Sequence, residues 1–136
     1  MQHHNWFAII TAAIVAFLIG GLWYSPLMFA KAWMNAHGYS PEKVKEMQAK
    51  APRTYSISFL CFVLMAFVLH LFVRHLGADT AVGGASWGFH AWLGFALPLG
   101  LTAHLYSDKP IAAFLIDSSY QLVFMTVMGA VLAGWP

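Results

Sequence analysis

Charge is what this chain has least of. Only 9% of its 136 residues are Asp, Glu, Lys or Arg, whereas soluble domains carry about 25%. The net charge is only +2, which argues against nucleic acid as a partner. Cysteine is almost absent too. Cys61 stands alone, which excludes an intramolecular disulfide framework, and its apolar neighbours predict a buried, unreactive thiol.

Familiar enzyme motifs are also missing. Gly83-Gly84 lacks the Lys-Ser/Thr sequence that follows in a phosphate-binding loop. Ser118-Ser119 lies beside Asp117, but no Ser-His-Asp order with a nucleophile turn is present. We therefore predict no catalytic residues, and the sequence leans against an enzyme without deciding the question.

Long apolar windows dominate the chain instead. Of all residues, 60% are hydrophobic and the mean hydropathy is +0.67. Four windows, at about 6–26, 55–76, 86–106 and 111–135, are each long enough as helices to cross the ~30 Å of hydrocarbon. Because lipid offers no hydrogen-bond partners, all four should be α-helical. We predict an all-α, polytopic membrane protein, with four transmembrane helices in an up-down bundle that forms one integral membrane domain over 1–136.

The distribution of Lys and Arg predicts the orientation. Six of the seven such residues lie in 31–54 or in the turn at 107–110, and the opposite side holds only Arg74. Positively charged loops stay in the cytoplasm, so 31–54 should be cytoplasmic and both termini extracytoplasmic. Within 31–54, Ser40 and Pro41 are typical of a helix start and predict a short amphipathic helix between the first two spans.

Small residues spaced by four predict where helices touch. Small side chains let helix backbones approach closely in lipid. These residues are Ala12, Ala16 and Gly20 in the first window, Gly84 and Gly88 in the third, and Gly129 and Ala133 in the fourth. Such faces on so small a bundle also predict a homo-oligomer, as a dimer or a trimer.

Asp117 is the acidic residue inside the fourth window. A carboxylate there costs about 2.5–3.5 kcal/mol at the centre of a span, so it should face the interior and find partners. His104 lies at a similar distance from the turn that joins the last two windows. The candidates for an ion or proton path are Asp117, His104, Tyr24, Ser25 and Gln121. The alternative is a carboxylate that holds helices together through hydrogen bonds.

Two histidines suggest a second hypothesis. His70 and His90 should lie at matched depths on adjacent helices, near the extracytoplasmic side, where two imidazoles can ligate haem or a metal. No cysteine or carboxylate stands near enough in sequence to complete a familiar metal motif. We therefore expect no cofactor, with haem as the alternative.

Several short sequence patches carry a family resemblance. They cover essentially the whole chain and follow the same order as in the family. They are Trp23-Tyr24-Ser25-Pro26 with Phe29 and Trp33, Ser58-Phe59-Leu60, Trp92-Leu93-Gly94-Phe95, and Phe114-Leu115-Ile116-Asp117 with Tyr120, Gly129 and Trp135. The chain thereby resembles the domain-of-unknown-function 1761 family, which are small four-span bacterial membrane proteins. The resemblance implies four spans in a bacterial cytoplasmic membrane, and it implies no activity, cofactor or catalytic residue.

Three functions follow as hypotheses. The first is an accessory or structural membrane subunit, which would act within a larger membrane complex. The second is an oligomeric channel or transporter with Asp117 in an ion or proton path. The third is a membrane redox protein with haem at His70 and His90. The expected partners are the lipid bilayer and further copies of the chain.

Overall fold

Helices form most of the protein. The computed structural model describes residues 3–136, and no strand occurs in that part of the chain, which confirms the prediction of an all-α fold. In chain order the elements are α1 (Trp6–Trp23), α2 (Ala30–His37), α3 (Pro41–Ala49), α4 (Ala51–His75), α5 (Ala81–Ala91), the π-helical segment η1 (Trp92–Ala96), α6 (Leu97–Tyr106) and α7 (Ile111–Gly134).

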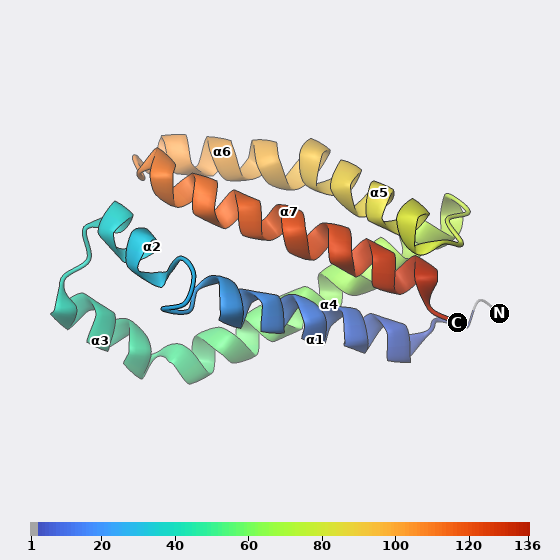
Figure 1. The fold of residues 1–136 in the computed structure, drawn as a ribbon, viewed down its shortest axis with the longest axis horizontal. Helices are drawn as coiled ribbons and strands as arrows, with labels where there is room; N and C mark the ends of the chain where they lie inside the picture. The colour runs from blue at the N-terminus through green and yellow to red at the C-terminus, as the bar shows by residue number, and fades with distance from the viewer. Residues whose placement is uncertain (1–2) are drawn as a thin grey trace.

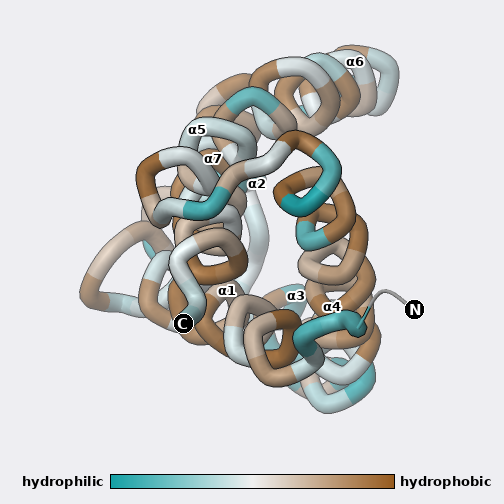
Figure 2. The backbone as a smooth tube through the Cα atoms, turned by 90° about the vertical axis from the view of Figure 1, so that its right-hand side faces the viewer, coloured by the Kyte–Doolittle hydropathy of each residue, from teal (hydrophilic) through white to brown (hydrophobic). Residues whose placement is uncertain are grey.

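Three of these helices, α1, α4 and α7, are long and apolar enough to cross a membrane. They have 18, 25 and 24 residues, with mean hydropathies of 2.2, 2.5 and 1.5. Large apolar side chains point outward from them, for example Phe7 at 83% exposure and Leu60 at 68%. Figure 2 shows hydrophobic residues around these helices rather than on one face only. Such a surface suits lipid and not water.

The predicted third span is a divided helix. Residues 81–106 are helical without a break, but the π-helical turn η1 separates α5 from α6. At its end the Leu97 N–H bonds to the Trp92 carbonyl, five residues back. Pro98 follows and has no N–H to donate, which favours a local change in the hydrogen-bond ladder. Three undivided candidate spans are therefore present where four were predicted.

The segment between the first two spans contains two helices, and only one was predicted. The predicted helix is α3, where the Ser40 hydroxyl accepts a hydrogen bond from the Lys43 N–H at 3.2 Å and Pro41 is the first helical residue. The unpredicted helix is α2, which ends at His37 and is capped by Gly38 in the left-handed region (φ 66°). The helix α4 starts at Ala51 rather than near 55, because Pro52 fits the first turn of a helix.

The helix α7 lies between the others. It packs against α5 and α6 on one side and against α1 and α4 on the other (Figure 1). The start of α1 and the end of α7 lie at one end of the molecule, and α2 and α3 lie at the opposite end. Ile9, Val73 and Met128 are at most 2% exposed where α1, α4 and α7 meet.

The helices α5 and α7 approach each other closely, and glycines make this approach possible. A Cβ atom at Gly84 would overlap the Gly129 carbonyl oxygen and the side chain of Ala133. One at Gly88 would overlap the Met125 carbonyl oxygen. The backbones of the two helices therefore touch, and this contact lies within a single subunit.

The small residues of α1 also lie within the subunit. Ala12 and Ala16 are at most 1% exposed. The Tyr120 hydroxyl donates to the Ala16 carbonyl at 2.8 Å. At Gly20 an added Cβ atom would stand 2.6 Å from the same hydroxyl, so a side chain there would disturb the α1–α7 contact.

Cys61 is exposed, so the prediction of a buried thiol is wrong. The buried positions of α4 recur at Ala66, Leu69 and Val73, which is a helical stripe. Cys61 lies outside this stripe, on the exposed part of the helix surface. An apolar neighbourhood in the sequence did not indicate burial because the outward face of α4 is apolar as well.

Candidate functional site

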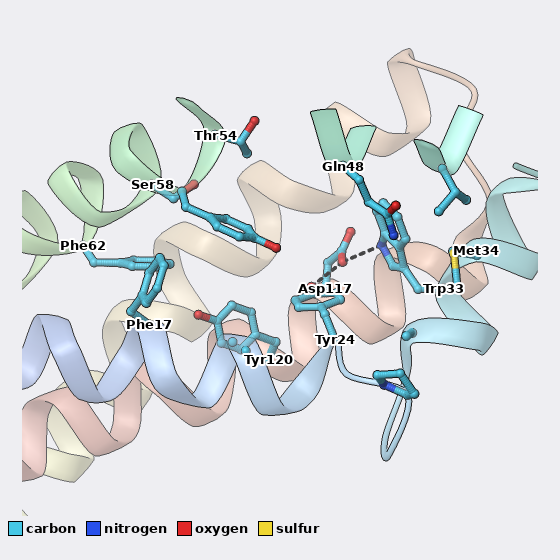
Figure 3. A pocket seen from close by; sticks show the side chains of 16 residues that line it. Phe17, Tyr24, Trp33, Met34, Gln48, Thr54, Ser58, Phe62, Asp117 and Tyr120 are labelled. Carbon is cyan, nitrogen blue, oxygen red and sulfur yellow. Dashed lines mark hydrogen bonds between the residues drawn. The ribbon is translucent and has the colours of Figure 1, made fainter. Parts of the chain in front are cut away.

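Asp117 points between the helices, as its depth in α7 requires. Its side chain is 24% exposed. One carboxylate oxygen, Oδ1, accepts hydrogen bonds from the Tyr24 hydroxyl at 2.5 Å and from the Trp33 indole Nε1 at 3.0 Å (Figure 3). Tyr24 follows the end of α1 and Trp33 belongs to α2. A single oxygen therefore joins three helices.

The second oxygen, Oδ2, faces His104 on α6. Its distance to the His104 Nε2 is 3.7 Å, which is too long for a hydrogen bond. The Nδ1 of His104 lies 2.9 Å from the Gly100 carbonyl oxygen. Because a carbonyl only accepts, Nδ1 carries a hydrogen, and the other nitrogen is left to face Asp117. Oδ2 and Nε2 thus face each other without a hydrogen bond.

Two further indoles hold the backbone on either side of Asp117. Trp23 donates to the Ile116 carbonyl at 3.1 Å, and Trp92 donates to the Ser118 carbonyl at 3.0 Å. These bonds fix the rotation of α7 and so the direction of the carboxylate. The site residues predicted from the sequence did not include Trp23, Trp33 or Trp92, although all three belong to the patches that carry the family resemblance.

Two of the predicted site residues take no part in these contacts. The Ser25 hydroxyl donates to the Leu22 carbonyl at 2.6 Å and closes the end of α1. Gln121 makes no hydrogen bond to Asp117 within residues 3–136. Its neighbour Tyr120 lines the space beside Asp117 instead.

That space is a cavity of about 690 Å³ between α1, α2, α3, α4 and α7, which is within the ~300–1,000 Å³ typical of small-molecule sites. Its aromatic lining residues are Phe17, Tyr24, Trp33, Tyr55, Phe62 and Tyr120. The tyrosines, Trp33 and Asp117 contribute polar groups to this lining. The other polar side chains that line the cavity are Gln48, Thr54 and Ser58. No Lys or Arg is among the described residues that line it.

The histidine nearest to this site outside the spans is His37. Its ring stacks on Tyr39 at 4.8 Å and meets Trp33 edge to face at 4.5 Å between centroids. Burial lowers the pKa of His37, and the positive charge of Lys109 acts in the same direction, while Asp117 opposes them. The ring therefore stays neutral at neutral pH, and it does not compensate the carboxylate of Asp117.

The histidines singled out for haem lie in different surroundings. His70 is 4% exposed, its ring is 5.8 Å from that of His4, and its ring nitrogens have no hydrogen-bond partner in residues 3–136. The Nδ1 of His90 lies 2.6 Å from the Ser86 carbonyl oxygen, and the ring lines a cavity of about 350 Å³ together with His75. Within the described chain no three His, Cys, Asp or Glu residues form a metal-binding group.

The Tyr24–Asp117 bond should contribute measurably to stability. Tyr24→Phe should lower the free energy of unfolding by about 1.5–3 kcal/mol, because the lost hydrogen bond has a charged acceptor. The effect should shrink when Asp117 is already Asn, which thermal unfolding of both single variants and the double variant measures. Tyr106→Phe is the control, since Tyr106 is 93% exposed. Equal effects of Tyr24→Phe in both backgrounds would contradict the pairing.

The site and fold together define a class of protein. Three apolar helices of spanning length make this an integral membrane protein, and a carboxylate with a side chain only 24% exposed lies among its helices. The chain belongs to the family described as "Protein of unknown function (DUF1761)", whose model matches residues 7–133. The resemblance inferred from the sequence is thereby confirmed over nearly the whole chain. No curated protein and no solved structure matches the chain.

Proposed function

We propose that this protein is a proton-carrying membrane transporter in which Asp117 binds and releases the proton. The observation that carries the proposal is the unequal use of the two carboxylate oxygens. Oδ1 accepts two hydrogen bonds, whereas Oδ2 faces His104 beyond hydrogen-bond distance, and the residue lines a large cavity. A carboxylate that serves only to hold helices together gains most when both oxygens are bonded.

The two donors to Oδ1 suit a change of protonation. Tyr24 and Trp33 donate to Oδ1 while the carboxylate is charged, and Oδ1 remains an acceptor after Oδ2 takes a proton. Uptake therefore leaves the local helix contacts in place. His104 offers a second place for the proton, because its Nε2 faces Oδ2. The proton leaves when Oδ2 returns it to His104 or to the cavity.

In residues 3–136, mostly apolar side chains lie between Asp117 and the far end of the molecule. Beyond Asp117 the interface of α1, α4 and α7 is filled by Ile9, Val73 and Met128, which are all buried. Transport therefore requires either a change in helix packing or a path shared with a second copy. We propose a homo-oligomer for this reason, in keeping with the small size of the chain.

We further propose four spans, with α5, η1 and α6 together as the third, in a bacterial cytoplasmic membrane. As a continuous helix, residues 81–106 reach about 39 Å at 1.5 Å per residue. This run lies along the length of α7 (Figure 1). The loop with α2 and α3 carries most of the Lys and Arg residues, which favours a cytoplasmic position for it and an extracytoplasmic one for both termini.

Cysteine labelling tests this topology. In a Cys61→Ser background, Lys45→Cys should react with a membrane-impermeant maleimide only after intact cells or spheroplasts are opened. Asp79→Cys, in the loop between α4 and α5, should react before they are opened. The reverse pattern, with position 45 labelled from outside, would overturn the orientation.

Proton flux tests the proposed function. The purified protein is reconstituted in liposomes with a pH gradient, and valinomycin with K⁺ compensates the charge that moves. We expect the gradient to decay faster than in protein-free liposomes, as reported by an internal pH-sensitive dye. Decay at the rate of protein-free liposomes would contradict the proposal.

One observation favours an accessory or structural subunit as the second candidate. The bonds from Tyr24 and Trp33 to Asp117 join α1, α2 and α7, which is what a structural carboxylate would do. If the protein is a structural subunit, substitutions of Asp117 should disturb folding or assembly, and the unsubstituted protein should show no proton flux.

A further inference from the structure

The geometry points to an amphipathic organic cation as a ligand of the 690 Å³ cavity. We propose that its ammonium group binds at Asp117 Oδ2 and that its apolar body lies along the aromatic lining residues. The inference rests on the proposed function in one respect, since the same carboxylate would hold either a proton or the ligand.

Charge complementarity is the first argument. Asp117 is the single carboxylate among the described lining residues, and neither Lys nor Arg lines the cavity. His37, which lies behind Trp33, is neutral at neutral pH because burial lowers its pKa. The lining therefore offers one carboxylate and no Lys or Arg, and His104, with its Nε2 3.7 Å from Oδ2, is the other titratable group that faces this oxygen. With His104 neutral, a ligand with one positive charge pairs with the carboxylate and removes the cost of leaving that charge unpaired.

The arrangement of aromatic rings is the second argument. Tyr24 and Trp33 contact each other at 6.0 Å next to the carboxylate, where their faces can attract a cation. Phe17 contacts Phe62 at 6.3 Å and Tyr55 at 5.9 Å. Figure 3 shows Phe17 and Phe62 on the side of the cavity away from Asp117 and Trp33. One end of the cavity is thus charged and the other apolar, which is the pattern of an amphipathic ligand.

The size and ligand set argue against an inorganic cation. Hard cations such as Ca²⁺ and Mg²⁺ take about six or more oxygen ligands. Here one carboxylate oxygen already accepts from two donors, and besides the tyrosines the remaining polar lining is sparse: Gln48, Thr54 and Ser58. Those three side chains can accept further N–H groups of an ammonium ligand. A cavity of about 690 Å³ is far larger than a single ion requires.

Two probe molecules of equal length separate the contribution of the ligand's positive charge to binding from that of its apolar body. 4-Phenylbutylamine is cationic at neutral pH, and 4-phenylbutanol is neutral. In titration calorimetry of the protein in detergent, with protein-free micelles as blank, we expect the amine to bind roughly tenfold or more tightly than the alcohol. In Asp117→Asn this preference should disappear. Equal binding of the two probes, or a preference that survives Asp117→Asn, would overturn the proposal and indicate a lipid-like apolar site.

A cavity-filling variant tests the position of the ligand. Gly21 lines the cavity, and a Cβ atom added there has nothing within 4 Å, so Gly21→Leu can fill the space without a clash at its first carbon. It should weaken amine binding about tenfold. Gly94→Leu is the matched control, because Gly94 is equally unobstructed and lies outside the cavity. Unchanged binding in Gly21→Leu would overturn the assignment of the cavity.

The two proposals fail separately. Proton flux without preferential amine binding would leave the transporter standing and reject the organic cation. Preferential amine binding without proton flux would reject the transporter and retain the organic cation as a ligand of the cavity.

Discussion

Asp117→Asn should reduce proton flux to the rate of protein-free liposomes while the protein stays folded. Asparagine keeps an oxygen that accepts from Tyr24 and Trp33, so the helix contacts at this position survive. It has no carboxyl group to take up a proton, so the exchangeable site is lost. Internal pH in liposomes measures the flux, and gel filtration with thermal unfolding in detergent measures the folded state.

Two further variants make this result specific. Asp108→Asn removes the same charge in the exposed turn between α6 and α7, where φ is 52° and asparagine is well tolerated, so the flux should be unchanged. Asp117→Leu should also abolish flux, and it should lower the free energy of unfolding by about 1–3 kcal/mol for each donor left unpaired. If flux persists in Asp117→Asn, the carboxylate is a structural group and the accessory subunit becomes the better hypothesis.

Gly129→Leu should prevent the protein from folding normally. A Cβ atom at Gly129 would overlap the Gly84 carbonyl oxygen and lie 3.2 Å from the Gly88 backbone nitrogen. These are backbone atoms, so no side chain can turn aside, and α5 must separate from α7. We expect a loss of about 3 kcal/mol or more in the free energy of unfolding. Circular dichroism during thermal unfolding, and the fraction of monodisperse protein after detergent extraction, measure it.

Gly94→Ala is the control for this prediction. It adds one methyl group to a helical glycine whose Cβ position has nothing within 4 Å, so stability should change little or rise slightly. A stable, monodisperse Gly129→Leu variant would show that the α5–α7 contact is looser than the geometry indicates.

The sequence by itself determined the membrane class, the α-helical fold and the family. Apolar windows of spanning length suffice for these, because a chain in lipid must satisfy its own backbone groups. The sequence also predicted local features that depend only on residues close to each other in the chain. The start of α3 at Ser40 and Pro41 follows from capping. The inward direction of Asp117 follows from the cost of a carboxylate in lipid.

Only the tertiary structure decided which partners meet. The inner and outer faces of a membrane helix are both apolar, so hydropathy gives a span and not its rotation. Cys61 for this reason is exposed although its neighbours are apolar. Trp33 reaches Asp117 from 84 positions away, because α2 folds back over the first turns of α7. Contacts between distant segments arise from helix packing, and no local pattern in this sequence encodes them.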